Sequence, residues 1–194
     1  PPPFFRRQRQ MCIRDRNISE RGPGLEGNYR KLHGGLSNID FLYFHSDKEY
    51  KELYSDQKDK RWAFKYTDKY QLNENVQVEV DWSKASDSLV LRDISGEITS
   101  IGSEREQYLN QNISITGEFK NLILKIEQEK NQSLNPLLTN GYEKSPSVDL
   151  SFFKNIGNFL FRENLNVSYF KADALHGFFG IKHSNKYLLS LIHI

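Results

Sequence analysis

The stretch "RWAFKYTDKYQLNENVQVEVDW", residues 61–82, alternates apolar and polar side chains on both sides of a polar centre. Alternation with a period of two predicts a half-buried β-strand and not a helix. Two such strands around a turn-rich centre indicate a hairpin, and one register should bring their apolar faces together. Folding back about Leu72 sets three apolar pairs opposite each other: Trp62 and Trp82, Phe64 and Val80, and Tyr66 and Val78.

The same pattern recurs along the chain. "ISITGEFKNLILKIE" (113–127) is expected to fold back near residues 119–120, and "VDLSFFKNIGNFLFRENLNVSYF" (148–170) near Asn158. An earlier pair, residues 24–32 and 36–44, turns at 33–35, and residues 178–189 form a last strand. The expected opposite pairs are Ile115 and Leu124, Ile113 and Ile126, Phe152 and Leu165, Leu150 and Val167, and Val148 and Tyr169.

The connections between these strands alternate in length. The short ones are expected at 33–35, 69–73, 118–121 and 156–160, and the long, polar ones at 46–59, 85–106 and 131–146. Outer-membrane barrels are built with tight turns on one side and long loops on the other. We therefore predict an all-β fold: an antiparallel up-and-down meander of about nine strands, open at its edges, which is an incomplete segment of a large transmembrane β-barrel.

The two faces of the strands have different expected roles. One face is expected to point into a polar lumen, through Gln77, Glu79, Asp81, Lys125 and Glu127. Trp62 and Trp82 on the other face are candidates for an aromatic girdle at the long-loop side of the membrane. A soluble β-sandwich is the alternative, with the two tryptophans in its core and the polar residues on its solvated face.

Both termini carry unusual sequence. "RRQRQMCIRDR" (6–16) and "LSLIHI" (189–194) back-translate to the two orientations of a transposase-based sequencing adapter. We therefore predict that residues 1–16 are an adapter-derived, disordered artefact, that residues 189–194 have the same origin, and that residues 17–188 are an internal barrel fragment.

This exclusion changes the composition. Without residues 1–16, the 27 basic and 25 acidic residues become 22 and 24, and the net charge changes from +2 to −2. The main electrostatic argument for nucleic-acid binding is then lost. The single cysteine, Cys12, also lies in the excluded segment. Residues 17–188 therefore contain no cysteine for a disulfide or a thiolate metal site. No run approaches the ~18 apolar residues of a spanning helix.

No catalytic or metal-binding pattern stands out in the sequence. The histidines outside the adapter segments are His33, His45, His176 and His183, and no two share metal-ligand spacing. A barrel hydrolase would need a serine, a histidine and an acid that meet in space. The nearest candidates are Ser37, Asp40 and His45. We expect no enzyme activity and no cofactor.

Several ordered segments resemble one family. They are "ISERGPGLEGNYRKL" (18–32), "FHSDKEY" (44–50), "KRWAFKYTDKYQLNENVQVEVDWSKASDSLVLRDI" (60–94), "YLNQNISITGEFKNLILKIEQEKNQSLN" (108–135) and "YEKSPSVDLSFF" (142–153). Together they resemble the barrel of the LPS-assembly protein LptD, also called Imp or OstA. The strongest likeness is the tryptophan hairpin with Asp81, Ser86, Asp87 and Asp93.

The resemblance implies transport at the Gram-negative outer membrane. In that family a barrel inserts lipopolysaccharide into the outer leaflet. Its partners are lipopolysaccharide itself, the plug lipoprotein LptE, an LptA-like periplasmic bridge and the membrane lipid. The alternatives are another large barrel, such as a porin or nutrient receptor, and, less favoured, a barrel hydrolase.

Overall fold

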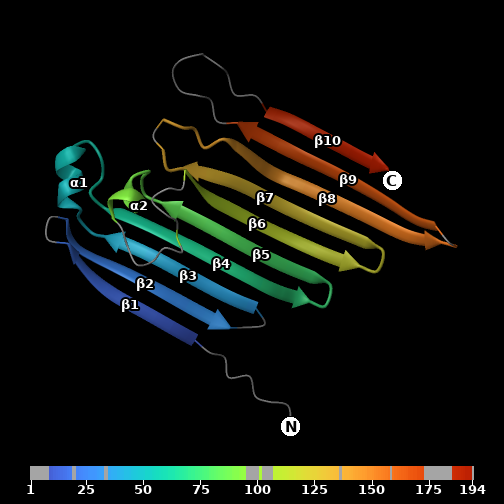
Figure 1. The fold of residues 1–194 in the computed structure, drawn as a ribbon, viewed down its shortest axis with the longest axis horizontal. Coiled ribbons are helices and arrows are strands. Elements are labelled where there is room, and N and C mark those ends of the chain that lie inside the picture. The colour runs from blue at the N-terminus through green and yellow to red at the C-terminus, as the bar shows by residue number, and fades with distance from the viewer. Residues whose placement is uncertain are drawn as a thin grey trace, which may run out of the picture.

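The chain forms one ten-stranded antiparallel sheet whose strands lie side by side in sequence order (Figure 1). The computed structural model describes residues 9–18, 21–32, 35–94, 101, 107–135, 137–157, 159–172 and 185–193. The elements are β1 (Arg9–Ile18), β2 (Gly22–Leu32), β3 (Gly35–Phe44), α1 (Lys48–Leu53), β4 (Arg61–Asn73), β5 (Val76–Ala85), α2 (Val90–Asp93), β6 (Tyr108–Phe119), β7 (Leu122–Ser133), β8 (Tyr142–Ile156), β9 (Phe159–Ala172) and β10 (Asn185–His193).

The predicted all-β meander is confirmed, with ten strands in place of about nine. The connections after β2, β4, β6 and β8 are tight, and those after β3, β5 and β7 are longer. The two short helices α1 and α2 belong to long connections and lie at the same end of the sheet (Figure 1). The sheet order runs from β1 to β10 without closing, so the segment is an open sheet.

The first strand corrects one expectation. We predicted that residues 1–16 are disordered. This prediction is wrong for residues 9–16, because β1 pairs antiparallel with β2 from Arg9 to Ile18. Its Met11 and Ile13 side chains remain mostly exposed. An open sheet edge offers unpaired backbone groups to almost any chain, so pairing here needs no matching side chains. The adapter origin of residues 1–16 and 189–194 stays a prediction.

The β4–β5 hairpin has a different register from the predicted one. Tyr66 lies opposite Trp82, and the backbone N–H of Ser86 donates to the carbonyl of Trp62 at 2.7 Å. Trp62 and Trp82 are therefore not opposite each other. The shift is an even number of residues, so every side chain keeps its predicted face.

Turn chemistry explains this shift. The hairpin turns at residues 74–75, where the Asn73 side chain accepts a hydrogen bond from the Asn75 N–H at 2.9 Å. In the β6–β7 hairpin the turn falls at residues 120–121, and Lys120 has a φ of 38°. Tight hairpin turns favour such positive φ values.

The other predicted registers are shifted in the same way. Ile115 lies opposite Ile126 and Leu150 opposite Leu165, each two residues from the expected partner. Both pairs stay on the apolar face. Of the predicted turn residues, positions 33, 34 and 158 lie outside the described residues, as do residues 178–184 of the expected last strand.

A buried apolar cluster lies at the long-loop end of the sheet. Strand residues Leu42, Phe44, Ala63 and Ala85 meet loop residues there. The remaining members are Val90, Leu91, Ile94, Ile101, Leu109 and Leu134. The connection between β5 and β6 thus folds back onto the sheet.

Candidate functional site

The register divides the strands into two faces of opposite character. We call one the polar face, defined by Lys65, Thr67, Lys69, Gln77, Glu79, Asp81, Asn112, Ser114, Lys125, Glu127, Asp149 and Asn166. We call the other the apolar face, defined by Ile39, Phe41, Phe64, Tyr66, Val78, Val80, Trp82, Ile113, Ile115, Leu124, Ile126, Val148, Leu150, Leu165 and Val167. All five residues expected to face a lumen lie together on the polar face.

Charges on the polar face are paired across and along strands. Lys69 on β4 contacts Glu79 on β5 at 2.7 Å, and Lys65 lies 3.6 Å from Asp81. Such opposite cross-strand charges stabilise a sheet. Lys65 and Lys69 were not among the residues predicted to face a lumen. Their alternation with Phe64 and Tyr66 in the sequence would have placed them on that face.

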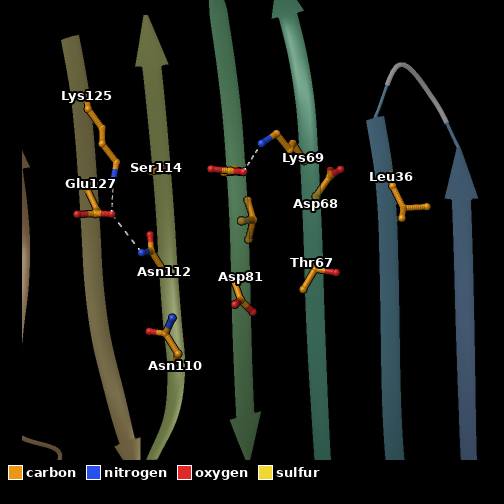
Figure 2. A pocket seen from close by; sticks show the side chains of 12 residues that line it. Leu36, Thr67, Asp68, Lys69, Asp81, Asn110, Asn112, Ser114, Lys125 and Glu127 are labelled. Carbon is orange, nitrogen blue, oxygen red and sulfur yellow. Dashed lines mark hydrogen bonds and ion pairs between the residues drawn. The ribbon is translucent and has the colours of Figure 1, made fainter. Parts of the chain in front are cut away.

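Glu127 is the centre of a second polar group. Lys125 and Lys144 donate to its two carboxylate oxygens at 2.7 and 2.9 Å, and Asn112 donates at 3.2 Å. Figure 2 shows Lys125 and Asn112 reaching Glu127 from β7 and β6. Further along, Asn166 donates to Asp149 across β8 and β9. The polar face is therefore a hydrogen-bonded surface of nearly balanced charge.

On β6 and β7, the exposure of the two faces is inverted relative to a soluble protein. Ile115 and Ile126 lie opposite each other on the apolar face and are 44% and 41% exposed. On the polar face of the same two strands, Ser114 and Glu127 are only 6% and 8% exposed. A contiguous exposed apolar surface marks a site of protein or membrane contact.

Aromatic side chains lie at both ends of the apolar face. Trp62 stacks on Phe64 with 5.8 Å between ring centroids, and Tyr43 lies opposite Trp62 on β3. At the short-turn end, Tyr70 and Phe119 are exposed. Trp62 and Tyr70 are eight residues apart on β4, about 26 Å at ~3.3 Å per residue. Strands of outer-membrane barrels tilt by ~35–45°, so this segment would rise ~20 Å and cover most of their ~25 Å apolar band.

A buried arginine ties two long connections to the sheet. Arg61, the first residue of β4, has a fully buried side chain that donates to Asp87 at 2.8 and 3.1 Å. It also donates to Asp47 at 2.9 Å and to Asp93 at 3.2 Å. Its guanidinium carbon lies 4.0 Å from the centroid of the Tyr50 ring. We call these residues the Arg61 cluster.

The sequence did not reveal the Arg61 cluster. Residues 46–59 were expected only to be a long, polar connection, but they contain α1, with Asp47 as its buried N-cap. Asp47 accepts from the Tyr50 N–H at 3.0 Å and from Arg21 at 2.8 Å. Asp47, three residues before Tyr50, was only a weak indication in the sequence that a helix begins there. Nothing local to Arg61 indicated carboxylate partners from two separate connections.

Acid should loosen the Arg61 cluster. Burial raises the pKa of Asp87, but hydrogen bonds from Arg61 and Ser86 outweigh it and hold the pKa below its ordinary value. A carboxylate whose folded pKa is lowered stabilises the fold above its unfolded pKa, ~3.9, and loses that contribution as pH falls through the folded pKa. We expect the free energy of local opening of residues 86–94 to fall below about pH 4. Hydrogen exchange corrected for its intrinsic pH dependence measures this.

Asp87→Asn is the matched variant for the acid effect. It should show weaker protection of residues 86–94 already at neutral pH, and a smaller further loss in acid. An opening free energy that stays constant from pH 7 to pH 3 in the unmodified protein would contradict the role given to Asp87.

The candidate hydrolase residues do not meet. Ser37 lies on the apolar side of β3 and donates to Asp68 at 3.0 Å. Asp40 lies on the polar side of the same strand, where Asn28 and Asn38 donate to it. A Ser-His-acid set needs its members within hydrogen-bonding reach. Ser37, Asp40 and His45 therefore do not form one.

Among the residues that the structure describes, no group of three or more histidine, cysteine, aspartate or glutamate residues is arranged to hold a metal ion. No helix within these same ranges combines the length and the apolar character needed to cross a membrane.

Comparison with known proteins gives one family. The LptD model, described as LPS transport system D, matches residues 59–177. The LPS-assembly protein LptD of Ectopseudomonas mendocina is 23% identical over 134 residues, which is 69% of this chain and 14% of that protein. Those of Salmonella typhi and Escherichia coli O1:K1 are 27% and 26% identical, over 67% of this chain and 16% of each relative.

The chain thus spans about one-sixth of the length of these curated relatives. The family match extends from the end of the first long connection, through the tryptophan hairpin, to the residues just after β9. It covers more than half of the chain, and the chain belongs to the LptD family of LPS transport proteins.

Proposed function

We propose that this chain is part of the wall of a large outer-membrane β-barrel that inserts lipopolysaccharide into the outer leaflet. The observation that carries the proposal is the single sheet with an exposed apolar face and a charge-paired polar face. Its supports are the family's description as an LPS transport system and the relatives' name, LPS-assembly protein.

The apolar face would contact lipid in this proposal. Trp62 and Trp82 lie on it toward the long-loop end and would belong to the aromatic girdle at that interface. Only closed barrels of strands satisfy all backbone groups in a bilayer, so further strands must continue the sheet beyond those described.

The polar face would line the lumen. Gln77, Glu79, Asp81, Lys125 and Glu127 would then meet the sugar part of lipopolysaccharide, while its acyl chains stay near hydrocarbon. The LptE-like plug and the LptA-like bridge are proposed partners on the basis of family resemblance. The protein would act as a transporter and not as an enzyme.

Photo-crosslinking from one strand tests the proposal. Glu79 and Val80 are neighbours on β5 that project to opposite faces. In the full-length protein in growing cells, a photoreactive residue at position 79 should capture lipopolysaccharide, and one at position 80 should capture phospholipid. Capture of a different solute but no lipopolysaccharide at position 79, in a correctly assembled barrel, would instead favour a porin or nutrient receptor.

A further inference from the structure

The polar face contains an open recess of about 540 Å³ over the middle of β4, β5, β6 and β7 (Figure 2). The side chains that matter for its chemistry are Thr67, Asp81, Asn110, Asn112, Ser114 and Glu127. Its size falls within the ~300–1,000 Å³ typical of small-ligand sites.

Charges around the recess are already compensated. Glu79 and Asp81 are paired with Lys69 and Lys65, and Glu127 accepts from two lysines. A phosphate site would need cationic donors that are not held by carboxylates. The recess is therefore poorly suited to a phosphorylated group.

The chemistry that remains is that of neutral hydrogen bonding. Asn110 on β6 is exposed in the recess, which Asn112 on the same strand and Thr67 on β4 also line. Amides and hydroxyls both donate and accept hydrogen bonds, as do the hydroxyl groups of a sugar. The surface thus matches an uncharged polyol.

The lining also indicates weak binding. High-affinity ligand pockets are lined mainly by apolar and aromatic side chains. The residues that line this recess include no aromatic ring, and Leu36 is the only one with a large apolar side chain on the polar face, because the side chain of Val80 projects to the apolar face. A path that must pass its cargo needs sites that are occupied easily and vacated easily.

We propose that this recess is a transient, low-affinity site for uncharged sugar units of a polysaccharide chain. The inference rests on the proposed function, because it takes the polar face to line the lumen. It adds that this part of the wall selects neutral sugar over phosphorylated sugar.

Saturation-transfer NMR on the full-length protein in nanodiscs tests the site with defined probes. Maltohexaose, a neutral glucan, should give a signal that is insensitive to salt, whereas glucose 6-phosphate and inorganic phosphate should give weaker ones. Asn110→Leu combined with Asn112→Leu should weaken maltohexaose binding by about fivefold, as expected for the loss of one or two hydrogen bonds. Asn164→Leu, on the polar face of β9 outside the recess, is the matched control and should not change it.

Other results would overturn the inference. These are a stronger, salt-sensitive signal from either phosphate probe, or maltohexaose binding that is equal in the double variant and the unmodified protein. Should the double variant not assemble, protection of Asn110→Cys from a neutral thiol reagent by maltohexaose gives the same test, and lack of protection counts against the site. Lipopolysaccharide capture at position 79 without any glucan binding would reject the recess and leave the proposed function standing.

Discussion

Replacing Arg61 with methionine is expected to release both long connections from the sheet. The variant would leave the carboxylates of Asp47, Asp87 and Asp93 facing one another without their shared cation. Breaking a buried ion pair by removing one partner costs ~3–5 kcal/mol. Hydrogen exchange in residues 47–53 and 86–94 should therefore accelerate on the order of a hundredfold or more, since exchange follows the free energy of local opening.

Arg92 provides the matched control for this experiment. It lies on α2, is mostly exposed, and contacts Asp93 at 3.5 Å. An exposed ion pair contributes at most ~1 kcal/mol, so Arg92→Met should leave exchange almost unchanged. Equal exchange in the Arg61 and Arg92 variants would show that the buried cluster does not hold the two connections.

Placing a positive charge at Ile115 is expected to destabilise the barrel in the membrane. Ile115 lies midway along β6 on the apolar face, opposite Ile126. Arginine on the lipid face of an outer-membrane barrel costs ~2–4 kcal/mol at the bilayer midplane. The Ile115→Arg variant of the full-length protein should therefore unfold from lipid vesicles at a lower denaturant concentration and reach a lower level in cells.

The neighbouring residue supplies the control. Thr116 is on the polar face of the same strand, opposite Gln77 and Lys125. A charge there would remain in a wet lumen, and Thr116→Arg should cost far less than Ile115→Arg. If the two variants lost the same stability, the apolar face would not be facing hydrocarbon.

The assignment of side chains to faces could be predicted because a strand has a period of two. Even the register errors preserved the faces, since Trp82 and Val78 moved along β4 by an even number of residues. The registers themselves depend on turns. The alternation of apolar and polar residues does not indicate the side-chain hydrogen bond at Asn73 or the positive φ of Lys120, so it could not predict where the turns fall.

The long-loop end was the least predictable part. Arg61 gathers carboxylates that are 14, 26 and 32 residues away in sequence, and nothing in its own neighbourhood specifies them. The two faces are periodic local features, whereas the Arg61 cluster depends on how two connections fold back. The strand β1 was missed for another reason: its pairing uses backbone groups that every residue except proline carries.

Spin labels placed one at a time at positions 76–84 of β5, in the full-length protein in lipid bilayers, test the assignment of faces most directly. Collisions with oxygen, which dissolves in lipid, should peak at positions 78, 80 and 82. Collisions with a water-soluble nickel chelate should peak at 77, 79 and 81. That alternation, in opposite phase for the two reagents, is the expected result. Equal access of the chelate to both sets of positions would show that β5 is solvated on both faces and does not form part of a membrane wall.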